Sequence, residues 1–184
     1  MESLKGCFLI ASRHLADPNF ARTVVLLLDH SPSGAIGLVL NRPTSKHVHD
    51  ISQMIELEFC ENDCAISMGG PVQGPLMCLH AHPAHSDAEI VEGVHLATQR
   101  DTIHAILRDH VSPLKVFAGY SGWGAGQLER EIEAGGWFVL AASSELVFTD
   151  GVDEMWALAL HQSGREFYRE TLGLTDFPDD ASLN

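Results

Sequence analysis

The first forty residues contain two continuous apolar runs. Residues 6–11 read Gly-Cys-Phe-Leu-Ile-Ala, and residues 22–30 include Val-Val-Leu-Leu-Leu. Short apolar runs with β-branched residues are typical of strands buried on both faces. The turn residues 31–34 lead into a third apolar run over 35–40. The pattern therefore predicts a hairpin, and Pro43 discourages further strand pairing after it.

Later segments place apolar residues at helical spacing. Over 98–111 these residues recur at i, i+3, i+4, i+7 and i+8, behind Thr98-x-x-Asp101, which has the form of a capping box. The same spacing predicts helices over 46–57, 127–134 and 152–170.

Shorter apolar segments predict the remaining strands, over 65–68, 76–80, 89–96, 116–120 and 137–142. The strands before residue 45 and after residue 115 have the composition of double-sided strands, whereas 65–96 is more irregular. We therefore predict an α/β plus α+β fold in one domain over 1–184. It consists of a mixed-sheet, three-layer main unit (1–60 with 112–184) and a smaller α+β unit inserted over 61–111.

Glycine is concentrated over 119–131, where four glycines and two aromatic residues precede a charged helical run. Glycine adopts positive φ without steric cost and allows close approach to the backbone, so this density predicts a tight strand-to-helix junction. Gln127 stands where a dinucleotide-binding fingerprint needs its third glycine, and Trp123 breaks the nucleophile-elbow pattern around Ser121. We favour a structural junction with Trp123 packed over it, and a backbone nest that binds a ligand stays open.

The charge of the chain is strongly negative, at −14. Because non-specific nucleic-acid binding depends on basic residues that neutralise phosphates, and no basic helix is visible, direct DNA or RNA binding is disfavoured. Residues 1–46 nevertheless carry five basic and three acidic groups. An acidic surface that maintains solubility explains the total, while a locally positive N-terminal region could hold an anion.

Neither a membrane span nor an export signal is expected. The longest apolar run, 24–28, is far shorter than the ~20 residues that cross a bilayer, and residues 1–5 lack the form of a signal peptide. We therefore expect a cytoplasmic protein without membrane partners, whose four cysteines stay reduced.

One cluster of candidate ligands lies near the middle of the chain. Cys78, His80 and His82 share the parity of one strand face, and thiolate and imidazole bind zinc or copper. No spaced Cys or His pair elsewhere in the sequence completes a recognised four-ligand pattern, so we expect no metal and no other cofactor. An enzyme is the alternative: a hydrolase or transferase would use Ser121, or Cys78, with His80.

Arg22, Asn41 and Arg42 flank the predicted strand ends. Arginine can clamp an anion bidentately and asparagine can orient it. Structural ion pairs to Asp17 or Asp29 would explain the arginines equally well, and both readings stay open.

The order of these motifs resembles the YqgE/AlgH family of bacterial proteins. The matching segments are 6–11, 17–30, 34–43, 69–72, 79–80 and 119–129. The resemblance implies a two-part α/β plus α+β fold, a cytosolic location and a role discussed as regulatory, without established catalytic residues. It also implies that its motif positions, Gly69 and Gly70 among them, meet at one surface or junction.

The sequence thus predicts a non-enzymatic regulatory or adaptor protein that binds an anionic small molecule or a protein partner. The arginine-bearing strand ends and the Trp123 turn are expected to form one groove. The predicted ligand or partner site comprises Arg22, Asn41, Arg42, His80, Gly119, Gly122, Trp123 and Gly124.

Overall fold

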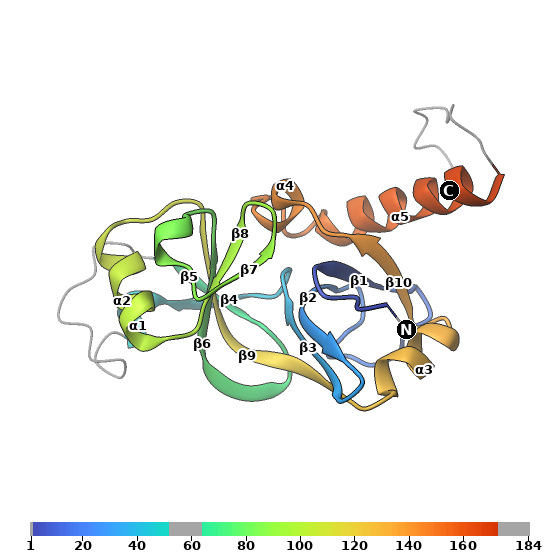
Figure 1. Ribbon diagram of the computed structural model, residues 1–184, viewed down its shortest axis with the longest axis horizontal. Coiled ribbons are helices and arrows are strands. Elements are labelled where there is room, and N and C mark those ends of the chain that lie inside the picture. The colour runs from blue at the N-terminus through green and yellow to red at the C-terminus, as the bar shows by residue number, and fades with distance from the viewer. Residues whose placement is uncertain (1, 52–63, 173–184) are drawn as a thin grey trace.

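The computed structural model describes residues 2–51 and 64–172 (Figure 1). Its strands are β1 (Cys7–Ala11), β2 (Val24–Ser31), β3 (Gly34–Val39), β4 (Pro43–His47), β5 (Ala65–Met68), β6 (Val72–His80), β7 (Ala88–Val91), β8 (Val94–Ala97), β9 (Leu114–Gly124) and β10 (Trp137–Ala141). Its helices are α1 (Val48–Ile51), the 3-10 turn η1 (Pro83–His85), α2 (Arg100–Arg108), α3 (Gln127–Glu133), α4 (Ser144–Val147) and α5 (Met155–Leu172). None of these helices is long and apolar enough to cross a membrane.

The described residues form one ten-stranded sheet in the order β10-β1-β2-β3-β9-β6-β8-β7, with β5 beside β9 and β4 beside β5. The described strands pair antiparallel, except for β5 with β9. The long strand β9 joins the two halves, because its first part pairs with β6 and its last part pairs with β3. The predicted combination of helices and strands is therefore confirmed, and the sheet is curled and mainly antiparallel. The three-layer main unit and the inserted unit stay predictions.

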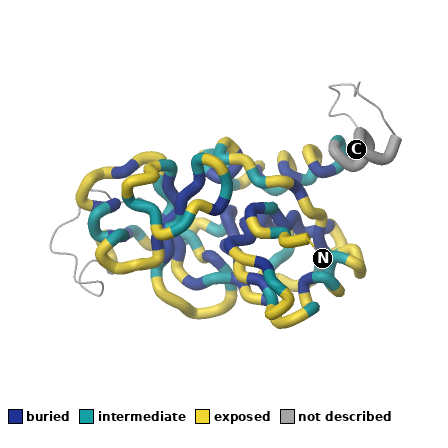
Figure 2. The backbone as a smooth tube through the Cα atoms, in the orientation of Figure 1, coloured by how far each residue is buried: buried dark blue, intermediate teal, exposed yellow. Residues whose placement is uncertain are grey.

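Within the described residues, three apolar clusters cover the two faces of this sheet. Buried residues follow the strands in both halves of the molecule (Figure 2). The largest collects residues from both halves of the sheet and is closed by α4 and α5. A second lies on the other face of β1–β3, under α3, and a third lies under α2. Alternate residues of β2 enter the first two clusters, Leu26 on one face and Val25 on the other. This confirms the prediction of double-sided strands over the first apolar runs.

The sequence suggested that the glycine-rich segment turns the chain at residue 119, but the structure has no turn there. The strand β9 continues through Gly119, Gly122 and Gly124, and the turn follows at Ala125-Gly126. Gly119 has φ +72°, and a Cβ there would lie 2.6 Å from the carbonyl oxygen of Val72. The glycine therefore lets β9 bend beside the irregular start of β6.

The local predictions over 43–57 and 89–96 differ in detail from the structure. Residues 43–47 form a strand where the sequence suggested the end of pairing and a helix start, and residues 48–51 of the predicted helix form α1. The rest of the predicted helix, 52–57, lies outside the described residues. The single strand expected over 89–96 is the hairpin of β7 and β8, because Gly93 adopts φ +74° between them.

The predicted helix over 98–111 is confirmed as α2, but its cap differs from the expected capping box. Gln99 is the N-cap and makes no side-chain cap bond. The carboxylate of Asp87 instead accepts hydrogen bonds from the backbone N–H groups of Thr98 and Gln99 and from the hydroxyl of Thr102. These bonds lower the pKa of Asp87 although burial opposes them. A residue from the preceding hairpin therefore supplies the cap, which local spacing could not show.

Candidate functional site

Arg22 lies just before β2 in a left-handed backbone conformation, with φ 58°. A residue other than glycine rarely adopts this conformation, since its Cβ approaches the following carbonyl. Asn41 holds the segment in place: its Nδ2 donates to the carbonyl of Arg22 at 2.9 Å, and its Oδ1 accepts from Val24 N–H at 3.0 Å. The Arg42 guanidinium donates to the carbonyl of Ala21. Two of the predicted site residues therefore position the third.

The side chain of Arg22 reaches α5. Its guanidinium carbon lies 5.8 Å from the ring centroid of Trp156, within the range of a cation–π contact. The indole Nε1 of Trp156 in turn donates to the carbonyl of Ala11, at the end of β1, at 2.8 Å. Arg22 is thus placed over an aromatic ring that is itself fixed to the sheet.

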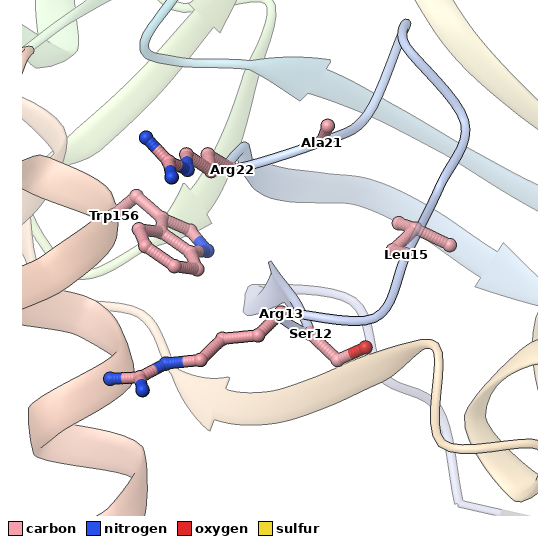
Figure 3. A pocket seen from close by; sticks show the side chains of 6 residues that line it. All are labelled: Ser12, Arg13, Leu15, Ala21, Arg22 and Trp156. Carbon is pink, nitrogen blue, oxygen red and sulfur yellow. The ribbon is translucent and has the colours of Figure 1, made fainter.

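A pocket of about 330 Å³ opens at this point, lined by Ser12, Arg13, Leu15, Ala21, Arg22 and Trp156 (Figure 3). Ser12 is only 4% exposed, and its hydroxyl has no hydrogen-bond partner among the described residues. Neither Arg13 nor Arg22 forms an ion pair within the described part of the chain. The pocket therefore combines two cations without a counter-charge and one buried, unsatisfied hydroxyl.

Trp123 does not line this pocket. It is 5% exposed, stacks on Phe20 with ring centroids 5.8 Å apart, and belongs to the cluster on the α3 side of the sheet. Trp156, which carries the Arg22 contact, packs against the cluster on the opposite face. The structure thus separates Trp123 from Arg22 and does not form the single groove expected from the sequence.

Glu131 fixes Trp123 from α3. One carboxylate oxygen, Oε2, accepts from the indole Nε1 of Trp123 at 3.0 Å and from that of Trp137 at 2.9 Å. Sequence spacing could not reveal this contact, because the two indoles come from different strands, β9 and β10.

His80 lies in the other half of the molecule, on β6, directly opposite His95 of β8. It is fully buried, its Nδ1 accepts from His82 N–H at 3.2 Å, and its Nε2 has no partner among the described residues. Burial, followed by the neighbouring His95 and His85, lowers the pKa of His80 to about 4. In the described chain no three histidine, cysteine or acidic side chains are placed to hold a metal ion.

The two candidate nucleophiles lack activation. Burial, together with the nearby Cys64, raises the pKa of Cys78 to about 12, so its thiol stays protonated at neutral pH. Ser121 is fully buried and donates to the carbonyl of Gly69 at 3.2 Å. An activated nucleophile would instead contact a base.

The buried His80 makes stability depend on pH. Its pKa is lower in the folded protein than in the unfolded chain, so unfolding takes up a proton between pH 6.5 and pH 4, and stability falls as the pH falls through that window. Between pH 7 and pH 5 we expect a loss of about 2 kcal/mol from this group. Urea unfolding at a series of pH values measures it.

Two single histidine variants, compared by the pH dependence of their unfolding free energy, test this assignment. His80→Gln should flatten the pH dependence of unfolding, whereas the exposed His14→Gln should leave it as in the unmodified protein. Equal slopes for the two variants would show that His80 is not the responsible group.

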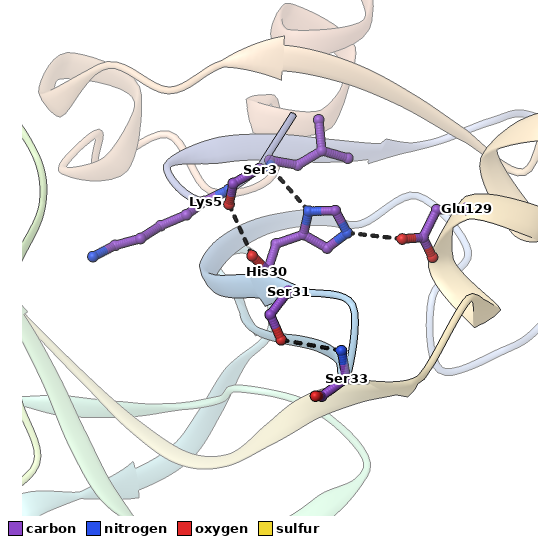
Figure 4. A network of polar contacts seen from close by, with 7 residues as sticks. Ser3, Lys5, His30, Ser31, Ser33 and Glu129 are labelled. Carbon is purple, nitrogen blue, oxygen red and sulfur yellow. Dashed lines mark hydrogen bonds and ion pairs between the residues drawn. The ribbon is translucent and has the colours of Figure 1, made fainter. Parts of the chain in front are cut away.

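One further histidine, His30, ties residues 3–4 to α3 (Figure 4). His30 Nδ1 accepts from Leu4 N–H at 2.9 Å, which leaves Nε2 to donate to Glu129 Oε1 at 3.1 Å. The Ser3 hydroxyl donates to the carbonyl of His30 rather than to its ring. Because both ring nitrogens are occupied, His30 serves as a clamp and not as a general base.

The described fold is that of a mixed α and β protein with a curled, mainly antiparallel sheet. The chain belongs to the AlgH-like family, whose model matches residues 8–168. It is 38% identical over 168 residues to the UPF0301 protein CT0663 of Chlorobaculum tepidum, with 88% of each chain covered. It is 36% identical over 172 residues to a UPF0301 protein of Saccharophagus degradans, with 90% of this chain and 85% of the relative covered.

Two solved structures share the fold. The solution structure of the AlgH protein from Pseudomonas aeruginosa matches with a TM-score of 0.75 and 30% identity, over 97% of this chain and 96% of that one. The crystal structure of protein DIP2367 from Corynebacterium diphtheriae matches with a TM-score of 0.72 and 25% identity, over 88% of each chain. The family resemblance predicted from the motifs is thereby confirmed.

Proposed function

We propose that this protein is a non-enzymatic regulatory or adaptor protein that binds a small oxyanion in the pocket between Arg13, Arg22 and Trp156. The observation that carries the proposal is the buried hydroxyl of Ser12, which lacks a partner beside two arginines that lack a counter-ion. A buried polar group without a hydrogen bond is costly, and a ligand atom would satisfy it.

Charge and geometry both favour an anion at this position. The guanidinium group presents a planar set of donors that matches carboxylate and phosphate oxygens. Asn41 and Arg42 hold the Arg22 backbone, so part of the ordering cost of binding is met before a ligand arrives. The surplus of basic residues over 1–46 in an otherwise acidic chain raises the local potential for anions.

The lining of the pocket supports binding without catalysis. No histidine, carboxylate or cysteine is among its six lining residues, so the Ser12 hydroxyl has no neighbouring base there. The hydrolase or transferase alternative is further disfavoured by the buried Ser121 and the protonated Cys78 described above.

In a regulatory protein, binding in the pocket must change a surface that a partner contacts, and α5 is placed to be that surface. The Arg22 side chain touches Trp156 near the start of this helix, which runs away from the body of the sheet (Figure 1). An oxyanion that recruits Arg22 competes with the contact to Trp156, so occupancy of the pocket alters the surroundings of α5. We infer that the partner is a protein, since the acidic chain opposes nucleic acids.

Titration with inorganic phosphate, followed by tryptophan fluorescence and by calorimetry, tests the proposal. The double variant Arg13→Gln/Arg22→Asn should weaken phosphate binding at least about 10-fold, since each charge-assisted contact contributes about 1.5 kcal/mol or more. Asparagine is chosen at position 22 because it tolerates the left-handed conformation.

The control variant is Arg130→Gln, which removes one charge from exposed α3 outside the pocket. It should bind phosphate as the unmodified protein does, at the same ionic strength set with sodium chloride. Unchanged affinity in the folded double variant would overturn the proposed site.

A further inference from the structure

The pocket has two chemically different sides. In Figure 3 the guanidinium groups of Arg13 and Arg22 both lie toward Trp156 and α5, whereas Leu15 and Ala21 lie on the opposite side. One side therefore suits a negative charge, and the other offers apolar surface. A bare inorganic ion would use only the first side.

The volume of the pocket also indicates a ligand larger than an inorganic ion. A volume of about 330 Å³ falls at the lower end of the range of small-molecule sites, which is about 300–1,000 Å³. An ion of five heavy atoms leaves much of that space to water against the side chain of Leu15. Removing apolar surface from water favours a ligand that fills the remainder.

Ser12 stands between the two sides and supplies a polar contact along the body of the ligand. Its hydroxyl oxygen points toward the Leu15 side rather than toward the guanidinium groups (Figure 3). A hydroxyl can donate or accept, so an ester or ether oxygen that follows the charged head would satisfy it.

We propose that the natural ligand is an organic oxyanion. Its phosphate or carboxylate head binds Arg13 and Arg22, an oxygen behind the head meets Ser12, and an apolar group lies against Leu15 and Ala21. This inference rests on the proposed oxyanion site and specifies the ligand class for it.

The experiment compares three phosphates and one neutral molecule on the full chain: inorganic phosphate, methyl phosphate, phenyl phosphate and phenol. Phenyl phosphate should bind at least 10-fold more tightly than methyl phosphate, and phenol should bind much more weakly than either. The readout is calorimetry, with the fluorescence of Trp156 as a second signal, because Trp123 and Trp137 are buried on the other side of the sheet.

Two variants locate the effect. Leu15→Ala should reduce the preference for phenyl phosphate over methyl phosphate and leave the affinity for inorganic phosphate unchanged. Ser12→Ala should weaken both esters and keep their ratio. The ratio in the unmodified protein tests the ligand class even if a variant folds poorly.

The possible failures are distinct. Equal affinities for methyl and phenyl phosphate, with both abolished by Arg13→Gln/Arg22→Asn, would overturn the ligand class and leave the oxyanion site standing. Absence of binding by every phosphate would overturn the site as well. If phenol binds as tightly as phenyl phosphate, the site recognises the apolar ring alone and the arginines do not contribute to affinity, which would overturn the oxyanion site.

Discussion

Replacement of Gly119 by alanine is expected to lower the free energy of unfolding by about 3–5 kcal/mol. Gly119 lies inside β9 with φ +72°, where an L side chain costs about 1–2 kcal/mol. A Cβ would also stand 2.6 Å from the carbonyl oxygen of Val72, and this obstacle is backbone rather than a flexible side chain. The pairing of β9 with β6 would have to shift to make room.

Gly122, three residues along the same strand, is the matched control. It is exposed, its φ lies outside the left-handed range, and an added Cβ would meet nothing nearer than a ring carbon of Tyr120 at 3.5 Å. Gly122→Ala should therefore change stability by less than about 0.5 kcal/mol. Urea unfolding of both variants makes the comparison, and similar losses would refute the role assigned to Gly119.

Glu131→Ala is expected to cost about 3 kcal/mol, because it leaves two buried indole N–H groups without an acceptor. Trp123 and Trp137 are 5% and 3% exposed, and both donate to the same oxygen of Glu131. Phe20 packs against both rings, with centroids at 5.8 Å and 5.4 Å. Loss of the carboxylate should therefore loosen the whole aromatic cluster.

Two further variants identify the carboxylate as the cause. Glu131→Gln keeps an acceptor oxygen near the indoles and should cost less than the alanine variant. Glu133→Ala, at an exposed position of the same helix, should be nearly neutral. Thermal unfolding and the near-ultraviolet circular dichroism of the tryptophans report the effect. An unchanged aromatic signal in Glu131→Ala would contradict the shared acceptor.

Variants of the pocket residues are expected to differ in their effect on the free energy of unfolding, which distinguishes residues that maintain the fold from residues that contact the ligand. Asn41 satisfies two backbone groups of the segment that bears Arg22, so its replacement would disturb the fold and the pocket together. Arg13 and the Arg22 guanidinium make no ion pair within the described residues, so their removal should cost little beyond the cation–π contact of Arg22 with Trp156, about 0.5–1 kcal/mol. This contrast justifies the choice of Arg13 and Arg22 for the binding tests.

Some features were determined by the sequence alone because their signals are local. The apolar runs over 6–11 and 22–30 became double-sided strands, and the helical period over 98–111 became α2. The order of the motifs carried the family resemblance, which a match over 8–168 confirmed. The N-terminal surplus of basic residues indicated the region in which the pocket lies.

Other features were decided only by the tertiary structure, because they depend on groups far apart in the chain. The pocket joins Ser12 and Arg22 to Trp156 of α5, and the cap of α2 comes from Asp87. Trp123 and Arg22 are separated because they contact helices on opposite faces of the sheet. Alternate residues of a strand point to opposite faces. Trp123 lies on the face covered by α3, whereas the Arg22 side chain contacts α5 on the other face, and only the tertiary packing of these helices decides this.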